Sequence, residues 1–292
     1  MKKVIYSLYI DIPKDELVSH TPMFWHLEKK DKNVVTKEEL KKHYQRLFKC
    51  KIDYANHLGV DFKMFEVDKM YIDFKKYIQS NFPEIKSYDI INFYKIHLLY
   101  KLAETYDEIL YLDFDTIPTT SESFFEKWNF KNGVCVLDNT HKIKEFGQIY
   151  QPQSIRSPTA KYYNAQAMLV ERGFKPFNKV INTGIIGIDK DHLTKLAYFD
   201  NFKEDINLMT NLRKQSDLFP KKVVESFGYD NETLFSYHLF SKDIKTQWLD
   251  DEWHFFYDTE FHIPKNRKII HAINKKFDFV WRYYDKNMHG LF

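Results

Sequence analysis

Short apolar runs alternate with amphipathic stretches along the first 115 residues of this 292-residue chain. Runs rich in β-branched and aromatic residues predict strands, and apolar residues at helical spacing predict helices. We expect strands at 4–12, 61–67, 109–112, 133–137, 180–188 and 268–272, and helices at 36–57, 88–105 and 229–240. Gly59 is the expected end of one helix, and Ser87 or Asp89 the expected cap of the next. The alternation favours an α/β fold, a mainly parallel sheet flanked by helices.

Two later segments do not follow this alternation. Residues 139–179 lack clear periodicity and contain three prolines, so we expect a long loop there, and long loops in compact domains are usually functional. The aromatic segment 277–284 is expected to pack as core and lid, with stacking on sugars as the alternative.

Composition excludes several classes of protein. Hydrophobic residues at 43% and charged residues at 29% are typical of a globular chain, and the net charge of +3 gives no field for nucleic-acid binding. No apolar run approaches the ~18 residues of a membrane span. Cys50 and Cys135 form no metal pattern, so we expect reduced thiols and a cytoplasmic location. Codon-biased residue usage suggests a bacterial or viral source. The glycine motifs of dinucleotide-binding and P-loop proteins are absent from the sequence.

The sharpest chemical signal follows the apolar run at 109–112. Asp113 and Asp115 come directly after it, two positions apart. In extended chain such residues face the same side, and ligands bind beyond the carboxyl ends of parallel strands. Two carboxylates held together repel each other unless a cation or a proton intervenes. The pattern therefore indicates a divalent metal, with a solvated turn as the alternative.

With these residues the sequence resembles the GT-A nucleotide-sugar glycosyltransferases, most closely the retaining family 8 type. The segment YDEILYLDFDT at 106–116 is similar to the metal-binding segment of that family. Residues 180–189, 229–234 and 271–276 resemble three further family segments in the same order, with Asn231 where the family has Gln. The resemblance implies a single GT-A domain over 1–292, in which 1–138 bind the nucleotide and 139–292 form the acceptor side.

The resemblance also implies roles for individual residues. Mn²⁺ or Mg²⁺ would be held by Asp113, Asp115 and His271, unless His271 is an ordinary core histidine. Asp230 would bind sugar hydroxyls and Asn231 would lie beside the anomeric carbon, although Asp230 also suits a helix N-cap. Lys95 would reach the donor, with a surface lysine as the alternative, and either Lys275 or Lys276 would neutralise the leaving diphosphate. The expected donor-binding residues are Tyr9, Asp11, Lys95, Asp113, Asn182, Gly184, Lys275 and Lys276.

The implied reaction is transfer of a sugar from a nucleotide diphosphate sugar to an acceptor hydroxyl. A UDP-sugar is favoured over a GDP-sugar, and the acceptor is a glycan, glycoprotein or glycolipid. The family implies retention, whereas an inverting enzyme would need Asp230 or Glu232 as general base. A sugar nucleotidyltransferase is a less favoured alternative, because residues 1–20 contain no glycine for a phosphate loop. The remaining alternative is a non-catalytic carbohydrate-binding module.

Overall fold

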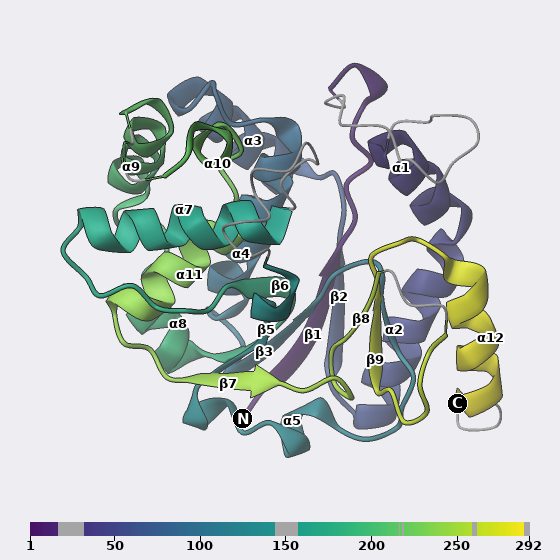
Figure 1. The fold of residues 1–292 in the computed structure, drawn as a ribbon. Helices are drawn as coiled ribbons and strands as arrows, with labels where there is room; N and C mark the ends of the chain where they lie inside the picture. The colour runs from purple at the N-terminus through teal and green to yellow at the C-terminus, as the bar shows by residue number, and fades with distance from the viewer. Residues whose placement is uncertain (17–31, 144–156, 216, 218, 259–261, 289–292) are drawn as a thin grey trace.

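Six strands form the central sheet in the order β2–β1–β3–β6–β5–β7. The computed structural model describes residues 1–16, 32–143, 157–215, 217, 219–258 and 262–288 (Figure 1). The strands of this sheet are β1 (Lys3–Leu8), β2 (Asp61–Phe65), β3 (Glu108–Leu112), β5 (Val134–Asp138), β6 (Ile181–Asp189) and β7 (Thr246–Leu249). β6 runs antiparallel to β3 and β5, while the other pairs are parallel. The expected mainly parallel sheet is confirmed.

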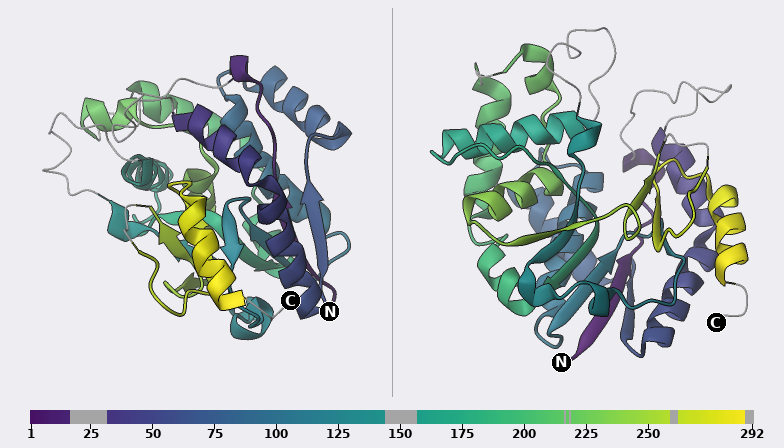
Figure 2. Two further views of the ribbon diagram at one scale, coloured as in Figure 1. Left: turned by 90° about the vertical axis from the view of Figure 1, so that its right-hand side faces the viewer. Right: turned by 60° about the horizontal axis from the view of Figure 1, so that its bottom comes forward.

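A second, smaller sheet has the order β4–β9–β8 and lies beside the central one (Figures 1 and 2). Its strands are β4 (Thr116–Pro118), β8 (Phe255–Tyr257) and β9 (Ile269–Ala272). β4 begins only four residues after β3 ends. The chain therefore passes from one sheet to the other across the Asp113–Asp115 motif.

Helices cover both faces of the central sheet (Figure 2). They are α1 (Lys32–Lys42), α2 (Tyr44–Leu58), α3 (Lys69–Asn81), α4 (Ser87–Leu102), α5 (Phe124–Lys127), α7 (Ser157–Glu171), α8 (Lys190–Leu196), α9 (Phe202–Gln215), α10 (Lys221–Glu225), α11 (Asn231–Ser241) and α12 (Phe277–Met288). The 3₁₀ turns are η1 (Lys14–Glu16), η2 (Phe130–Asn132) and η3 (Thr140–Lys142).

Alternation along the strands divides the core into two layers. Val4 and Tyr6 of β1 pack in the layer of α3, α4 and α11, whereas Ile5 packs with Tyr54 of α2. Successive side chains of a strand point to opposite faces, which explains the separation. β3 is buried along its whole length, as its apolar run predicts.

Several predicted element boundaries need correction. The helix expected at 36–57 is two helices, α1 and α2, separated at His43. The imidazole of His43 accepts a hydrogen bond from Trp281 Nε1 at 3.1 Å. The predicted cap of α4 is wrong, because Lys86 is the N-cap and offers no side-chain bond. Gly59 does end α2, in the left-handed conformation at φ 64°.

The long loop expected at 139–179 is wrong in part. Residues 144–156 lie outside the described residues, but η3 and α7 occupy much of the rest. α7 buries polar side chains, among them Thr159, Asn164 and Gln166, as well as apolar ones. A helix whose buried face contains polar residues shows no continuous apolar stripe, so the spacing of apolar residues could not reveal it.

The C-terminal aromatic segment and the cysteines agree with the sequence analysis. Phe277 and Trp281 are buried on one side of α12, as the core part of the prediction states, whereas Phe279 is exposed. Cys50 and Cys135 are both buried free thiols. In the part of the chain that the structure describes, no helix is long and apolar enough to cross a lipid bilayer.

Gly133 gives a direct test of this architecture. Its φ of 141° and ψ of 172° lie in a backbone region that essentially only glycine adopts. A Cβ at this position would lie 2.5 Å from the backbone oxygen of Lys245. We expect Gly133→Ala to lower the free energy of unfolding by about 1–3 kcal/mol, measured by urea denaturation. Gly228→Ala is the matched control, because a Cβ there meets nothing within 4 Å. Equal stability of the two variants would contradict this assignment.

Candidate functional site

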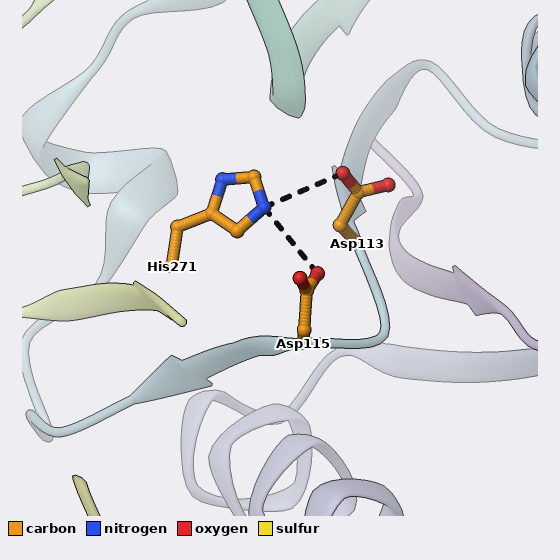
Figure 3. Close-up of side chains that lie close together, drawn as sticks. All are labelled: Asp113, Asp115 and His271. Atoms are coloured by element: carbon orange, nitrogen blue, oxygen red, sulfur yellow. Dashed lines mark ion pairs between the residues drawn. The ribbon is translucent and has the colours of Figure 1, made fainter. Parts of the chain in front are cut away.

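Asp113 and Asp115 lie in a tight turn rather than in extended chain. The Asp113 amide donates to Gly184 O at 2.8 Å, and its carbonyl accepts from the Thr116 amide at 2.9 Å. The turn brings both carboxylates to the edge between the two sheets, as Figure 3 shows. The two side chains converge as expected, but the turn and not strand alternation is the cause.

His271 of β9 completes a group of three potential metal ligands. Thr116 of β4 pairs with His271 in the antiparallel register, which places the imidazole beside the turn. His271 Nε2 lies 3.6 Å from Asp113 Oδ2 and 3.3 Å from Asp115 Oδ1 (Figure 3). One ligand atom from each residue lies within 4.8 Å of the others, and among the described residues no other such group of three is found.

The imidazole of His271 is fixed from two sides. Its Nδ1 lies 3.0 Å from Nε2 of the fully buried His254. Burial and the neighbouring His271 hold the pKa of His254 well below its usual range, so His254 is neutral. On the other side a Cβ at Gly184 would lie 2.2 Å from His271 Cε1. Gly184 is therefore required for close packing against the imidazole.

Two lysines reach the carboxylates. Lys275 Nζ pairs with Asp115 Oδ2, and Lys95 Nζ lies 3.5 Å from Asp113 Oδ1. Lys95 is buried rather than a surface lysine, and it also donates to Thr183 O at 3.2 Å. Burial by itself would raise the pKa of Asp115, but the neighbouring Lys275 ammonium, with a further contribution from His271, outweighs burial and holds the pKa well below its usual range.

Lys275 and Lys276 therefore differ in position. Lys276 is exposed, and its backbone N–H donates to Asn274 Oδ1 at 3.0 Å. Lys275 lies in the left-handed region at φ 57°, which turns its side chain back to Asp115. The geometry brings Lys275 to the carboxylates.

A second polar network joins β6 to the start of α11. Glu232 Oε1 accepts from the Thr183 amide at 2.9 Å and from Asn182 Nδ2 at 3.0 Å, and Glu232 Oε2 accepts from Lys161 Nζ. Asn231 Nδ2 donates to Thr183 Oγ1 at 2.8 Å. The network holds the N-terminus of α11 against the strand that carries Gly184.

Asp230 is the N-cap of α11, the alternative that the sequence analysis kept open. Its Oδ1 accepts from the Thr233 amide at 2.8 Å and its Oδ2 from Thr233 Oγ1 at 2.7 Å. Burial raises the pKa of Asp230. Burial, with a further contribution from the charge of Asp230, raises the pKa of Asp89 in the first turn of α4 to about 7.

Tyr9 and Asp11 follow the end of β1. The Tyr9 ring packs against Phe114 and Tyr44, with centroid distances of 4.8 and 5.2 Å. Asp11 pairs with Lys37 at 2.7 Å and lines a pocket of about 360 Å³ between the β1 exit and α3. Tyr71 and Lys75 of α3 close the other side of this pocket.

The donor set fits a divalent cation. If His271 Nδ1 donates to His254, the Nε2 lone pair faces two carboxylate oxygens, and three acceptors converge with no proton between them. Carboxylates suit Mg²⁺ and Mn²⁺, and an imidazole nitrogen also binds transition metals. The side chain of Asp113 is 26% exposed, so the group is open to solvent.

Sequence reasoning missed several residues of the site. Lys161 lies in the segment without periodicity, and His254 carries no local signal. Lys51, which is buried beneath the turn, was detectable, because it follows Leu47 by four positions on the apolar face of its helix. A lysine at an apolar position of a helix indicates a side chain whose polar partners should be sought elsewhere in the fold.

Comparison with protein-family models and with curated protein sequences gives no match. Solved structures do resemble the chain. The bifunctional glycosyltransferase WbbM has a TM-score of 0.50 at 12% identity; the match covers 99% of this chain and 50% of WbbM, so the chain spans half of that longer protein. A glycosyltransferase involved in glycosylation of the major capsid of PBCV-1 has a TM-score of 0.45 at 13% identity, over 96% of this chain and 100% of the other.

The galactosyltransferase LgtC, solved with donor and acceptor sugar analogues, has a TM-score of 0.44 at 12% identity, over 92% of this chain and 87% of LgtC. At these identities the likeness concerns the fold. The chain shares its α/β fold with WbbM, in agreement with the GT-A fold that the sequence resemblance implies.

Gly184 tests the packing of the candidate metal group. We expect Gly184→Ala to displace the His271 ring and to weaken Mn²⁺ binding by about tenfold or more, because ligand orientation controls metal affinity. Titration of Mn²⁺ followed by electron paramagnetic resonance measures the change. Gly228→Ala again serves as the control, and an unchanged Mn²⁺ affinity in Gly184→Ala would show that His271 is not a ligand.

The raised pKa of Asp89 predicts a pH-dependent stability. The folded protein holds this proton up to about pH 7, whereas the unfolded chain loses it near its usual 3.8. The carboxyl therefore costs stability increasingly between these values, and the full cost is present above pH 7. We expect Asp89→Asn to raise the melting temperature by about 2–4 °C more at pH 8 than at pH 5. The exposed Asp73→Asn is the control, and a pH-independent effect at Asp89 would refute the raised pKa.

Proposed function

We propose that this chain is a metal-dependent glycosyltransferase that moves a sugar from a nucleotide diphosphate sugar to an acceptor hydroxyl. The observation that carries the proposal is the convergence of Asp113, Asp115 and His271, with Lys275 beside them, at the end of a buried parallel strand. Crevices at such strand ends are where α/β folds bind ligands. The fold that the chain shares with glycosyltransferases supports the same class of reaction.

Asp113, Asp115 and His271 would hold Mn²⁺ or Mg²⁺. The ion would supply a Lewis acid that stabilises the charge on the leaving diphosphate. The chain adds its own positive charge from two directions, since Lys275 and Lys95 each lie against one of the carboxylates. Preorganised cations act most strongly where charge develops in a water-poor site. We assign the phosphate-neutralising role to Lys275 rather than to the exposed Lys276.

The hydrogen bonding of α11 favours retention of the anomeric configuration, as the family 8 resemblance implies. An inverting enzyme needs a carboxylate free to take the acceptor proton. Both oxygens of Asp230 accept bonds from Thr233, and both oxygens of Glu232 accept bonds from Lys161 and β6. We propose that Asp230 and Asn231 line the donor sugar, together with Asn182 and Gly184, and that the leaving phosphate takes the proton.

The nucleotide would occupy the β1 exit. Tyr9 and Asp11 follow β1, and the pocket lined by Asp11 and Tyr71 has a size suited to a base or ribose. A UDP-sugar is the favoured donor, with GDP as the second base to test. The acceptor would be a glycan, glycoprotein or glycolipid. We keep the proposed division into a nucleotide-binding half, 1–138, and an acceptor half, 139–292, although the metal group takes His271 from the second half.

Nucleotide binding tests the proposal. In a thermal-shift experiment, we expect UDP or GDP to stabilise the protein only when Mn²⁺ or Mg²⁺ is present, and EDTA to abolish the shift. Ligand at about 100 times its dissociation constant adds ~2.7 kcal/mol of stability. Asp115→Asn should lose the shift, whereas the exposed Asp73→Asn should keep it. A nucleotide-induced shift that persists in Asp115→Asn and in EDTA would overturn the metal assignment.

A further inference from the structure

Lys51 of α2 is a fully buried lysine beneath the turn that carries the two aspartates. Its Nζ donates to Leu47 O of its own helix at 3.1 Å. It also donates to Phe114 O at 2.8 Å and to Thr116 O at 2.7 Å. An ammonium has three N–H donors, so these bonds use all of them.

The two carbonyls that Lys51 holds lie on either side of Asp115. The remaining carbonyls of the turn have backbone partners: Asp113 O accepts from the Thr116 amide, and Asp115 O from the Ala272 amide at 3.0 Å. Phe114 and Thr116 are themselves buried. Without Lys51 two buried carbonyls would lose their bond to it, and unpaired buried polar groups are costly.

Lys51 also acts on the turn through its charge and its packing. Its Nζ lies 5.2 Å from the centroid of the Phe114 ring. Burial lowers the pKa of Lys51, while Cys50, Asp115 and Asp113 act in the opposite direction. A positive charge beneath the turn offsets part of the repulsion between the two carboxylates, which point toward His271 (Figure 3).

We propose that Lys51 is a positioning residue for the candidate metal site. By fixing the carbonyls on both sides of Asp115 to one nitrogen of α2, it sets the backbone geometry in which Asp113, Asp115 and His271 converge. Its hydrogen bonds go to backbone carbonyls and not to the three candidate ligand side chains. The inference rests on the metal role proposed above.

The test compares Mn²⁺ binding in two variants of Lys51 with matched variants of Lys49. Lys49 lies on the same helix but is exposed and pairs with Asp53 at 2.7 Å. Lys51→Met removes all three hydrogen bonds at similar volume, and Lys51→Gln retains up to two donors. Each full-length variant is titrated with Mn²⁺ by electron paramagnetic resonance below its own melting temperature, and melting curves are recorded separately.

We expect Lys51→Met to weaken Mn²⁺ binding by about tenfold to a hundredfold, the range typical of removing a group that orients metal ligands. Lys51→Gln should fall between Lys51→Met and wild type, and Lys49→Met and Lys49→Gln should bind as wild type does. If Lys51→Met does not fold, the comparison of Lys51→Gln with Lys49→Gln decides. A Lys51 variant that melts early but binds Mn²⁺ with wild-type affinity would overturn the inference. Absence of Mn²⁺ binding in the wild type would instead overturn the proposed function.

Discussion

The turn from Asp113 to Thr116 is the constraint on which the rest of the site depends. Within it the chain leaves the central sheet at β3 and begins the small sheet at β4. Asp113 is bonded to β6 through Gly184, and Asp115 is bonded to β9 through Ala272. A change in this turn would therefore alter the relation between the two sheets as well as the spacing of the carboxylates.

The elements around the turn are arranged so that charged groups can converge there. β6 runs antiparallel to β3, which places Gly184 against both the turn and the His271 ring. β9 pairs with β4 and supplies the imidazole, and the segment after β9 returns Lys275 to Asp115. Two carboxylates, one imidazole and two lysines come from parts of the chain as distant as α4 and β9. Such a balanced group favours binding of a divalent ion together with an anionic ligand.

Much of this arrangement could be predicted from the sequence, because the residues that carry these signals are neighbours along the chain. The apolar run at 109–112 identifies a buried strand, and the aspartates after it identify a ligand-binding edge. Gly59 was a reliable helix end because the αL conformation favours glycine. The turn at Asp113–Thr116 could not be predicted, because apart from the bond between Thr116 and Asp113 its hydrogen bonds go to residues that are distant in sequence, such as Gly184 and Lys51.

The residues that were missed share this dependence on distant partners. α7 shows no periodicity because it buries polar side chains as well as apolar ones, and the role of Lys161 depends on its contact with Glu232. Likewise, the roles of Lys275 and Lys276 can be separated only by the backbone conformation that follows β9.

The central claim is that Asp113, Asp115 and His271 bind one divalent ion. Crystals grown with Mn²⁺ and UDP, measured at a wavelength where manganese scatters anomalously, test it most directly. We expect one anomalous peak within coordination distance of the two carboxylates and His271 Nε2, and no such peak in crystals of Asp115→Asn. A wild-type crystal with UDP bound and no anomalous peak at these three side chains would contradict the account.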